Sequence, residues 1–438
     1  MRALRVGLGA PSGPFRETAR SHGIVLTFLS EIRSVFVTAP PGYSAAAVER
    51  VRRSYEPTGL TPRARSGGVS LVIYLVESLM DPNDLGLRYT SEPMPNFRSI
   101  AAEQIHGRAV VPFEYYGSAE TEFELLTGMS MAFLPAGSIP FRQYVRRPLP
   151  ALPRMLHDLG YATIAVQAGP RTFYDRERVE PLLGFDRTIW PYGAPGVARA
   201  DRGRWPSDDV IVDSVIAASE GPRPFFIFAF PASMHSPYHS GTYARADLDV
   251  RDAPTPAAAA EVKEYINAVR VADRAIGHLV EHFRGARDSV VIAIMGDHLP
   301  PFSSDVLALF TRRLARLPTA ARARATRATP MLVWANFSLP PGEITLSTNM
   351  LPGYLLERVG APGRELFALT DSLRRALPVT SAVAEANDGR LWLIDSVPPP
   401  LRRALADYRV LQYDILLGHR FSQGWKTLAA SAAPRTTP

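Results

Sequence analysis

The 438-residue chain contains no cysteine, and this absence excludes disulfide-stapled folds, CxxC redox sites, cysteine-ligated zinc and cysteine nucleophiles. Lysine is nearly absent as well: Lys263 and Lys426 are the only two, so almost all of the 49 basic residues are arginines. With 42 acidic residues the formal net charge is +7. A codon bias toward arginine explains this balance, and so does an affinity for phosphate groups or an anionic membrane surface.

Long apolar runs are also missing. No segment approaches the ~20 consecutive apolar residues of a membrane-spanning helix. The best run near the N-terminus covers residues 24–29 and is shorter than the core of a signal peptide. We therefore expect no transmembrane segment and no export signal in this chain. Nucleic acid is not expected as a partner either, because the sequence shows neither a basic stripe nor a nucleic-acid-binding module.

The bulk of the chain has the composition of a packed protein, with 46% hydrophobic and 21% charged residues. Near-continuous apolar and β-branched runs predict buried strands at residues 69–76, 162–167, 225–230, 289–295 and 331–335. Helical patterns lie between them at residues 119–127, 149–159, 208–219, 257–283 and 351–359. This alternation predicts an α/β fold with a mostly parallel sheet sandwiched by helices.

The organisation that we expect has four parts. Residues 1–66 are rich in Arg, Pro and Ala and are interpreted as a linker or platform with one short helix at residues 45–55. The α/β domain covers residues 67–375. Residues 376–428 form a smaller appended C-terminal subdomain, and residues 429–438 are a frayed tail.

Ligands of an open parallel sheet bind beyond the carboxyl ends of its strands. Three predicted strands are followed there by residues that carry chemistry: Glu77 after the first, His235 and His239 after the third, and Asp297-His298 after the fourth. Each residue also has an ordinary interpretation, as a solvated loop carboxylate or a loop histidine. Their shared position at strand ends favours a common site.

Ser118 is a further candidate, because it follows Gly117 directly before a helical pattern and is therefore a natural helix N-cap. A hydroxyl there lies beside free backbone N–H groups at the positive end of the helix dipole, where phosphate binds well. The mixture of Glu77, Asp297 and His298 suits a hard or borderline divalent cation, and the hydroxyl can fill its open position. A purely structural N-cap is the alternative for Ser118.

In order along the chain, these residues resemble the lipoteichoic acid synthase and phosphoglycerol transferase family of the alkaline phosphatase/sulfatase superfamily. The segment 118–128, SAETEFELLTG, is similar to that family's nucleophile segment, where threonine is usual. The strand ending in Val76-Glu77-Ser78 looks like its first metal-ligand motif. The resemblance covers roughly residues 67–360 and also rests on residues 137–141, 173–176, 183–186, 234–238 and 296–298.

The resemblance implies a division of roles. Glu77, Asp297 and His298 would hold one divalent cation together with Ser118, which would be the nucleophile. Mn²⁺ or Mg²⁺ is the expected ion, with Zn²⁺ as the alternative. His235 would also act in proton transfer, which suits a side chain with a pKa close to neutral. The phospholipid headgroup pocket would be lined by Tyr174, Arg176, His235 and His239.

The expected activity is a metal-dependent transfer of phosphoglycerol, or a similar phospho-alcohol, from a phospholipid to a glycan or polymer hydroxyl through a phospho-serine. The expected location is the cell envelope, at the membrane surface on the periplasmic or extracytoplasmic face of the inner membrane. A phosphodiesterase or sulfatase-type hydrolase and a catalytically silent headgroup-binding protein are the alternatives. Ser138, in Ser-Ile-Pro-Phe-Arg, fits the sulfatase pattern, but it precedes no clear helix and the paired aspartates usual after the first strand are missing.

Overall fold

The computed structural model describes Gly23 and residues 37–55, 68–198, 205–239, 241, 247–363 and 366–422. The predicted tail at residues 429–438 and most of the predicted platform lie outside the described residues. Within the platform, the helix expected at residues 45–55 is confirmed as α3 (Ala45–Ser54). Its N-cap is Ser44, whose side chain accepts a hydrogen bond from the Ala47 N–H.

The central element is an eight-stranded sheet with the order β4-β3-β5-β1-β6-β7-β2-β8. Seven strands run in one direction, and β7 alone is antiparallel to its neighbours β6 and β2. The bounds are β1 (Ser70–Val76), β2 (Ile105–Val110), β3 (Ala162–Gln167), β4 (Arg187–Ile189), β5 (Phe225–Phe230), β6 (Val290–Gly296), β7 (Ala328–Ala335) and β8 (Gly342–Ser347). The predicted mostly parallel sheet is confirmed.

All five predicted strands are present, and two of them match to the residue. The sequence patterns missed β2, β4 and β8. These strands lie toward the two ends of the sheet, where their side chains are only partly buried. Continuous apolar composition therefore marks only the strands that are covered on both faces.

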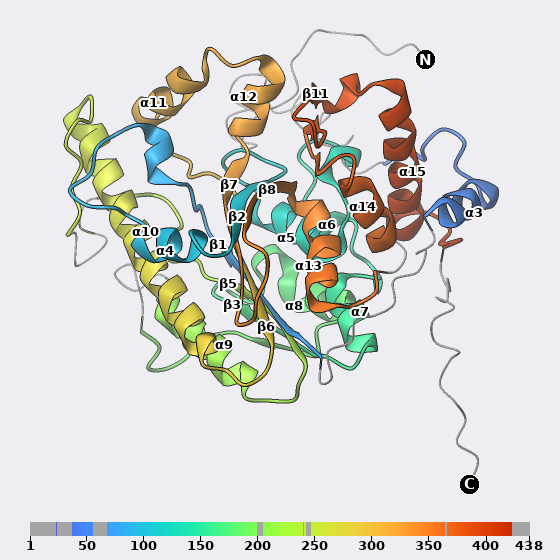
Figure 1. The fold of residues 1–438 in the computed structure, drawn as a ribbon, viewed down its shortest axis with the longest axis horizontal. Helices are drawn as coiled ribbons and strands as arrows, with labels where there is room; N and C mark the ends of the chain where they lie inside the picture. The colour runs from blue at the N-terminus through green and yellow to red at the C-terminus, as the bar shows by residue number, and fades with distance from the viewer. Residues whose placement is uncertain are drawn as a thin grey trace.

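Helices cover both faces of the sheet, as Figure 1 shows with α4, α9 and α10 on one side and α5, α7, α8 and α13 on the other. Two of the five predicted helices have the expected bounds, and the other three shift by one to three residues at their ends. The bounds are α4 (Pro95–Ala101), α5 (Ser118–Thr127), α6 (Pro140–Gln143), α7 (Leu152–Asp158), α8 (Arg176–Leu183), α9 (Asp208–Ser219), α10 (Pro256–Arg284), α11 (Ser304–Leu314), α12 (Thr319–Ala325) and α13 (Leu351–Val359).

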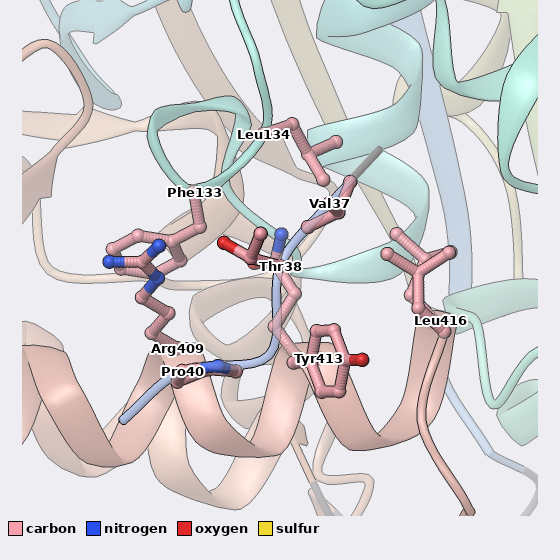
Figure 2. Close-up of a pocket in the computed structure, with 10 residues that line it drawn as sticks. Val37, Thr38, Pro40, Phe133, Leu134, Arg409, Tyr413 and Leu416 are labelled. Atoms are coloured by element: carbon pink, nitrogen blue, oxygen red, sulfur yellow. The ribbon is translucent and has the colours of Figure 1, made fainter. Parts of the chain in front are cut away.

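The C-terminal part forms the expected smaller layer. It contains a three-stranded antiparallel sheet, β9 (Val379–Thr380), β10 (Val383–Glu385) and β11 (Leu391–Leu393), with the helices α14 (Leu366–Arg374) and α15 (Pro399–Leu416). The segment before α3 packs on α15, and Figure 2 shows Val37, Thr38 and Pro40 beside α15 in a small pocket. The Tyr43 hydroxyl donates to Asp414 at 2.6 Å and fixes this contact.

The C-terminal layer also holds the far end of α5. The Tyr408 hydroxyl donates to the Gly128 carbonyl at 2.5 Å, at the point where α5 ends. The Gln412 side chain pairs with the Ser130 backbone, accepting from its N–H at 2.7 Å and donating to its carbonyl at 2.9 Å. The helix that begins at Ser118 is therefore fixed at its C-terminal end by α15.

Candidate active site

Three of the predicted site residues meet at one edge of the sheet. Strands β1 and β6 are neighbours with Val76 paired to Gly296, so the residues that follow them emerge side by side. Glu77, Asp297 and His298 each offer a ligand atom, and these atoms all lie within 4.8 Å of one another. His298 Nε2 lies 3.5 Å from Glu77 Oε1 and 3.4 Å from Asp297 Oδ2, and all three side chains are buried.

Ser118 joins this group, with its Oγ 3.4 Å from His298 Nε2. The predicted N-cap role is wrong by one residue: Gly117, at φ 109°, is the N-cap, and Ser118 is the first helical residue. The Ser118 side chain interacts with the Asp297 carboxyl group and lowers its pKa, against the larger effect of burial. Its hydroxyl therefore faces the cluster, while Thr121 Oγ1 ties the first turn of α5 to the Asp297 carbonyl at 2.7 Å.

Backbone groups fix the orientation of the acidic and imidazole side chains. Asp297 Oδ1 accepts from the backbone N–H groups of Ser78 and His298, each at 2.7 Å. His298 Nδ1 lies 2.9 Å from the Leu299 carbonyl, and a carbonyl can only accept. The proton of a neutral imidazole is therefore on Nδ1, and Nε2 presents its lone pair to the cluster.

Gly296, the last residue of β6, allows a close approach between neighbouring segments. Its φ is not in the left-handed region, but a Cβ placed on it would lie 2.4 Å from the Leu79 carbonyl oxygen and 2.9 Å from Thr329 Cβ. Glycine is required here because two backbones approach closely. This close packing sets Asp297 beside the end of β1.

The electrostatics of the cluster fit a cation. Burial, and then the neighbouring Glu77 carboxylate, raise the pKa of Asp297 to about 7. Burial lowers the pKa of His298, but the carboxylates of Asp297 and Glu77 outweigh it and raise the pKa overall. Asp297 Oδ2 is buried and accepts no hydrogen bond in the described part of the chain. Buried carboxylates of this kind are normally paired or bound to metal, and the oxygen and nitrogen donors present here suit a divalent cation.

Tyr174 and Arg176 lie next to this group. Burial, and then the nearby Glu120, raise the pKa of Tyr174, and Glu77 and Asp297 contribute in the same direction. Arg176 is fully buried and forms a bidentate pair with Glu122, with Nε 3.1 Å from Oε2 and Nη2 bonded to Oε1. Its guanidinium carbon also lies 5.1 Å from the centre of the Phe230 ring. Arg176 Nη1 is buried without a hydrogen-bond partner.

His235 and His239 follow β5, which is the neighbour of β1, so they lie at the same edge of the sheet. His235 is half-buried, with Nδ1 2.7 Å from the Ser236 carbonyl and its ring 5.5 Å from the Trp205 ring. His239 is exposed. Neither histidine belongs to the close group formed by Glu77, Asp297 and His298.

Two acidic residues of α5 have a place at the site that the sequence reasoning did not assign. Glu122 is the counter-ion of Arg176. Glu120 is buried, its Oε2 accepts no hydrogen bond, and burial raises its pKa to about 7. Glu120 lies in the first turn of α5, where an acidic residue is normally attributed to the helix dipole. The burial of all ten residues of α5, which indicates another role, is visible only in the structure.

Ser138 is engaged elsewhere. Its hydroxyl donates to the Pro135 carbonyl at 2.6 Å and lies 3.0 Å from the Tyr144 hydroxyl. Contrary to the sequence analysis, a short helix, α6, begins two residues after it. Ser138 therefore has hydrogen-bond partners of its own, whereas the Ser118 hydroxyl faces the acidic and imidazole groups.

The sheet with helices on both faces, and the acidic and histidine cluster beyond its strands, define an alkaline-phosphatase-like protein. Residues 70–352 match the family model described as Sulfatase, and the chain belongs to this family. Family membership and the cluster together support an enzyme. In the described part of the chain, no helix combines the length and the apolar character that crossing a membrane requires.

Three similar proteins extend this comparison. A putative cyclic beta-1,2-glucan modification protein of Rhizobium meliloti (strain 1021) is 30% identical over 417 residues, which are 93% of this chain and 63% of that protein. The chain thus spans less than two thirds of that relative. Streptococcus pyogenes phosphoglycerol transferase GacH, solved with sn-glycerol-1-phosphate, has a TM-score of 0.70 at 16% identity, covering 88% of this chain and 97% of its own. Lipoteichoic acid synthase LtaP from Listeria monocytogenes has a TM-score of 0.61 at 17% identity, covering 84% and 97%. The two structures share the fold.

Proposed function

We propose that the protein transfers a phosphoglycerol headgroup, or a similar phospho-alcohol, from a phospholipid to a glycan hydroxyl through a phospho-serine on Ser118. The observation that carries this proposal is the position of Ser118 Oγ, 3.4 Å from His298 Nε2 and at the N-terminus of α5 beside Glu77 and Asp297. The name of the R. meliloti relative supports a cyclic β-1,2-glucan as the acceptor. The name of the S. pyogenes structure, a phosphoglycerol transferase solved with sn-glycerol-1-phosphate, supports a phosphoglycerol donor group.

Glu77, Asp297 and His298 would hold a divalent cation, Mn²⁺ or Mg²⁺, with the Ser118 hydroxyl completing the set. Such an ion supplies Lewis-acid chemistry: it lowers the pKa of a bound hydroxyl and offsets negative charge on phosphoryl oxygens. Asp297 Oδ2, buried and without a hydrogen bond among the described residues, is the ligand atom that most needs such a partner.

The residues of the chain divide the remaining work. Ser118 reacts as its alkoxide and is released as the alkoxide: its Oγ forms a bond to phosphorus while the bond from phosphorus to the diacylglycerol oxygen breaks. His235 donates a proton to that leaving oxygen and takes one back from the acceptor hydroxyl, whose attack on phosphorus releases Ser118. Free N–H groups at the start of α5 stabilise the charge on the phosphoryl oxygens.

The headgroup pocket in this proposal is lined by Tyr174, Arg176, His235 and His239. Arg176 would act through Nη1, the buried donor that its pair with Glu122 leaves unused. A fixed guanidinium donor beside the phosphorus suits a phosphate oxygen, because arginine presents its N–H groups in a rigid plane. Work on a phospholipid donor places the protein in the cell envelope, at the periplasmic or extracytoplasmic face of the inner membrane.

An exposed aromatic side chain supports a sugar acceptor. Tyr116, two residues before Ser118, is 59% exposed. Two residues span at most about 7 Å, so the backbone of Tyr116 lies close to that of the nucleophile. The loop that carries it is fixed, because the Leu299 N–H donates to the Glu114 carbonyl at 2.9 Å and Arg327 pairs with Glu114 at 2.9 Å. A rigidly held ring at this place offers an apolar surface on which a glucose ring of the acceptor can stack.

The test is peptide mass spectrometry after incubation with phosphatidylglycerol and Mn²⁺. A glycerophosphate adduct on the peptide with Ser118, absent from Ser118→Ala and retained in the matched Ser138→Ala, is the expected result. An adduct on Ser138, or turnover that survives Ser118→Ala, would remove Ser118 as nucleophile. Diacylglycerol release with no transfer to glucan would instead identify a hydrolase.

Metal content distinguishes the enzyme from a silent headgroup-binding protein. We expect about one Mn²⁺ per chain, and we expect Asp297→Asn to lose both the ion and the adduct. Absence of stoichiometric metal from the wild-type chain, together with headgroup binding and no turnover, would favour the silent binder.

A further inference from the structure

The longest stretch of the sequence that contains basic but no acidic residues covers most of α11 and all of α12. Between Asp305 and Glu343 the sequence has no acidic residue and six arginines, at positions 312, 313, 316, 322, 324 and 327. The helix α11 ends at Leu314 and α12 covers Thr319–Ala325, so five of these arginines lie on two short helices and the turn that joins them, and Arg327 follows α12. We call residues 312–322 the arginine tip.

The arginine tip is turned to solvent. Arg312, Arg313, Arg316 and Arg322 are exposed, and Leu317 between them is 39% exposed. In the described part of the chain, Arg316 and Arg322 form no ion pair. The last two arginines of the stretch differ, because Arg324 pairs with Glu385 and Arg327 with Glu114.

A surface with clustered arginines and an exposed leucine suits a partner that offers both negative charge and an apolar layer. Arg313 interacts with the Asp84 carboxylate, but the arginines of the tip outnumber the carboxylates beside them. Neighbouring guanidinium groups repel one another, so further negative charge that comes close stabilises their grouping. A phosphate-rich bilayer surface supplies that charge, and its interface also accepts an apolar side chain such as Leu317. A soluble phosphate ester would match the charge alone.

The arginine tip lies at the same edge of the sheet as the catalytic cluster. The helix α11 begins six residues after His298. Strand β7, which follows α12, starts beside the end of β6, where Thr329 Oγ1 donates to the Gly296 carbonyl at 2.9 Å. The Glu114 loop that carries Tyr116 is also bonded to this region, through Thr326 Oγ1 at 3.0 Å. In Figure 1, α11 and α12 stand together at the top of the molecule, with α11 beside the upper end of α10.

We propose that the arginine tip docks the protein onto an anionic phospholipid surface and so brings the Ser118 edge to the headgroup of its donor. This inference rests on the proposed function, since it is the phospholipid donor that makes a bilayer the relevant surface. Each arginine at an anionic surface contributes about fivefold in affinity. Removal of three should therefore weaken binding by roughly 100-fold.

The experiment compares three forms of the full chain in sedimentation with vesicles. The test variant carries R312Q, R313Q and R316Q. A matched control carries R274Q, R402Q and R403Q, which removes the same charge from exposed positions on α10 and α15. The vesicles are equimolar phosphatidylglycerol and phosphatidylcholine, with phosphatidylcholine alone as the neutral comparison.

The expected result is binding of the wild type and the control to anionic vesicles and loss of about two orders of magnitude in the test variant. Equal binding by the test and control variants, or equal wild-type binding to neutral vesicles, would overturn the proposal. Leu317→Ser is a gentler second variant, which should weaken vesicle binding without a change in charge.

A soluble short-chain phosphatidylglycerol separates this proposal from the proposed function. The test variant should form the Ser118 adduct with the soluble donor as fast as the wild type and should lose rate only with vesicles. Equal loss with both donors would overturn the docking role. If the wild type forms no adduct with either donor, yet binds anionic vesicles through the arginine tip, the proposed function is refuted. The role of the arginine tip in vesicle binding would then still stand.

Discussion

Replacing Glu122 with glutamine tests the buried ion pair on which the headgroup pocket depends. Arg176 is fully buried, and Glu122 Oε1 and Oε2 together accept from two of its guanidinium nitrogens. Removal of one partner of such a pair leaves an uncompensated charge in a low-dielectric interior, which typically costs about 3–5 kcal/mol. Glutamine keeps the shape of the side chain, so the measured change reports on charge and not on a cavity.

The lower end of that range is expected, about 3 kcal/mol, because a second carboxyl group can respond. Burial raises the pKa of Glu180 to about 7, and Arg176 opposes this shift. Glu180 also interacts with Arg176, and Glu122 helps to raise its pKa, so without Glu122 it should ionise more readily. The Glu180 carboxyl group accepts hydrogen bonds from Gln167 Nε2 at 2.8 Å and from Thr188. These two bonds fix its position near Arg176.

Urea unfolding at neutral pH measures the effect, and the neighbouring pair of Asp175 and Arg178 supplies the control. That pair is at 2.6 Å, but its side chains are 46% and 36% exposed. Asp175→Asn should therefore cost under about 1 kcal/mol, and asparagine tolerates the left-handed backbone found there, with φ 64°. A cost below about 1 kcal/mol for Glu122→Gln as well would refute the claim that burial makes the first pair critical.

Three further predictions follow from single contacts. Tyr116→Ala should raise the KM for glucan several-fold and leave the Ser118 adduct unchanged, whereas Tyr116→Phe should retain transfer; a donor-side defect in Tyr116→Ala would contradict the acceptor role. Burial raises the pKa of Glu180 in the folded protein from its ordinary value of 4.5 to about 7, so this carboxyl contributes stability that is full below pH ~4.5 and lost as the pH rises through 7. The free energy of unfolding of the wild type relative to Glu180→Gln should thus fall by up to about 3 kcal/mol between pH 4.5 and 8, and a flat difference would show that the carboxyl is ionised throughout. Gln412→Leu should destabilise the fold by about 1–3 kcal/mol in urea unfolding, because the buried N–H of Ser130 loses its acceptor while the Ser130 carbonyl still accepts from the Phe133 N–H; a neutral effect would mean that α15 does not hold α5.

The central strands of the sheet could be predicted from the sequence because local residue patterns mark them. Strands such as β5, with the sequence FFIFAF, are buried on both faces, so their continuous apolar composition identifies them. Strand β2, with the sequence IHGRAV, has polar, half-buried side chains and lies near the end of the sheet, so no local pattern marked it. The antiparallel direction of β7 was also beyond local patterns, since direction is decided by how the chain returns to the sheet.

Sequence alone determined which residues could form the site, because the ends of parallel strands necessarily meet at one edge. Glu77, Asp297 and His298 follow predicted strands and lie together. Ser118 was predicted from the start of a helix and lies beside them. Only the tertiary structure decided which buried charged side chains neutralise one another. Glu122 could be recognised as the counter-ion of Arg176 only after α5 and α8 had packed, since the two residues are 54 positions apart and their charges interact strongly only when both leave water.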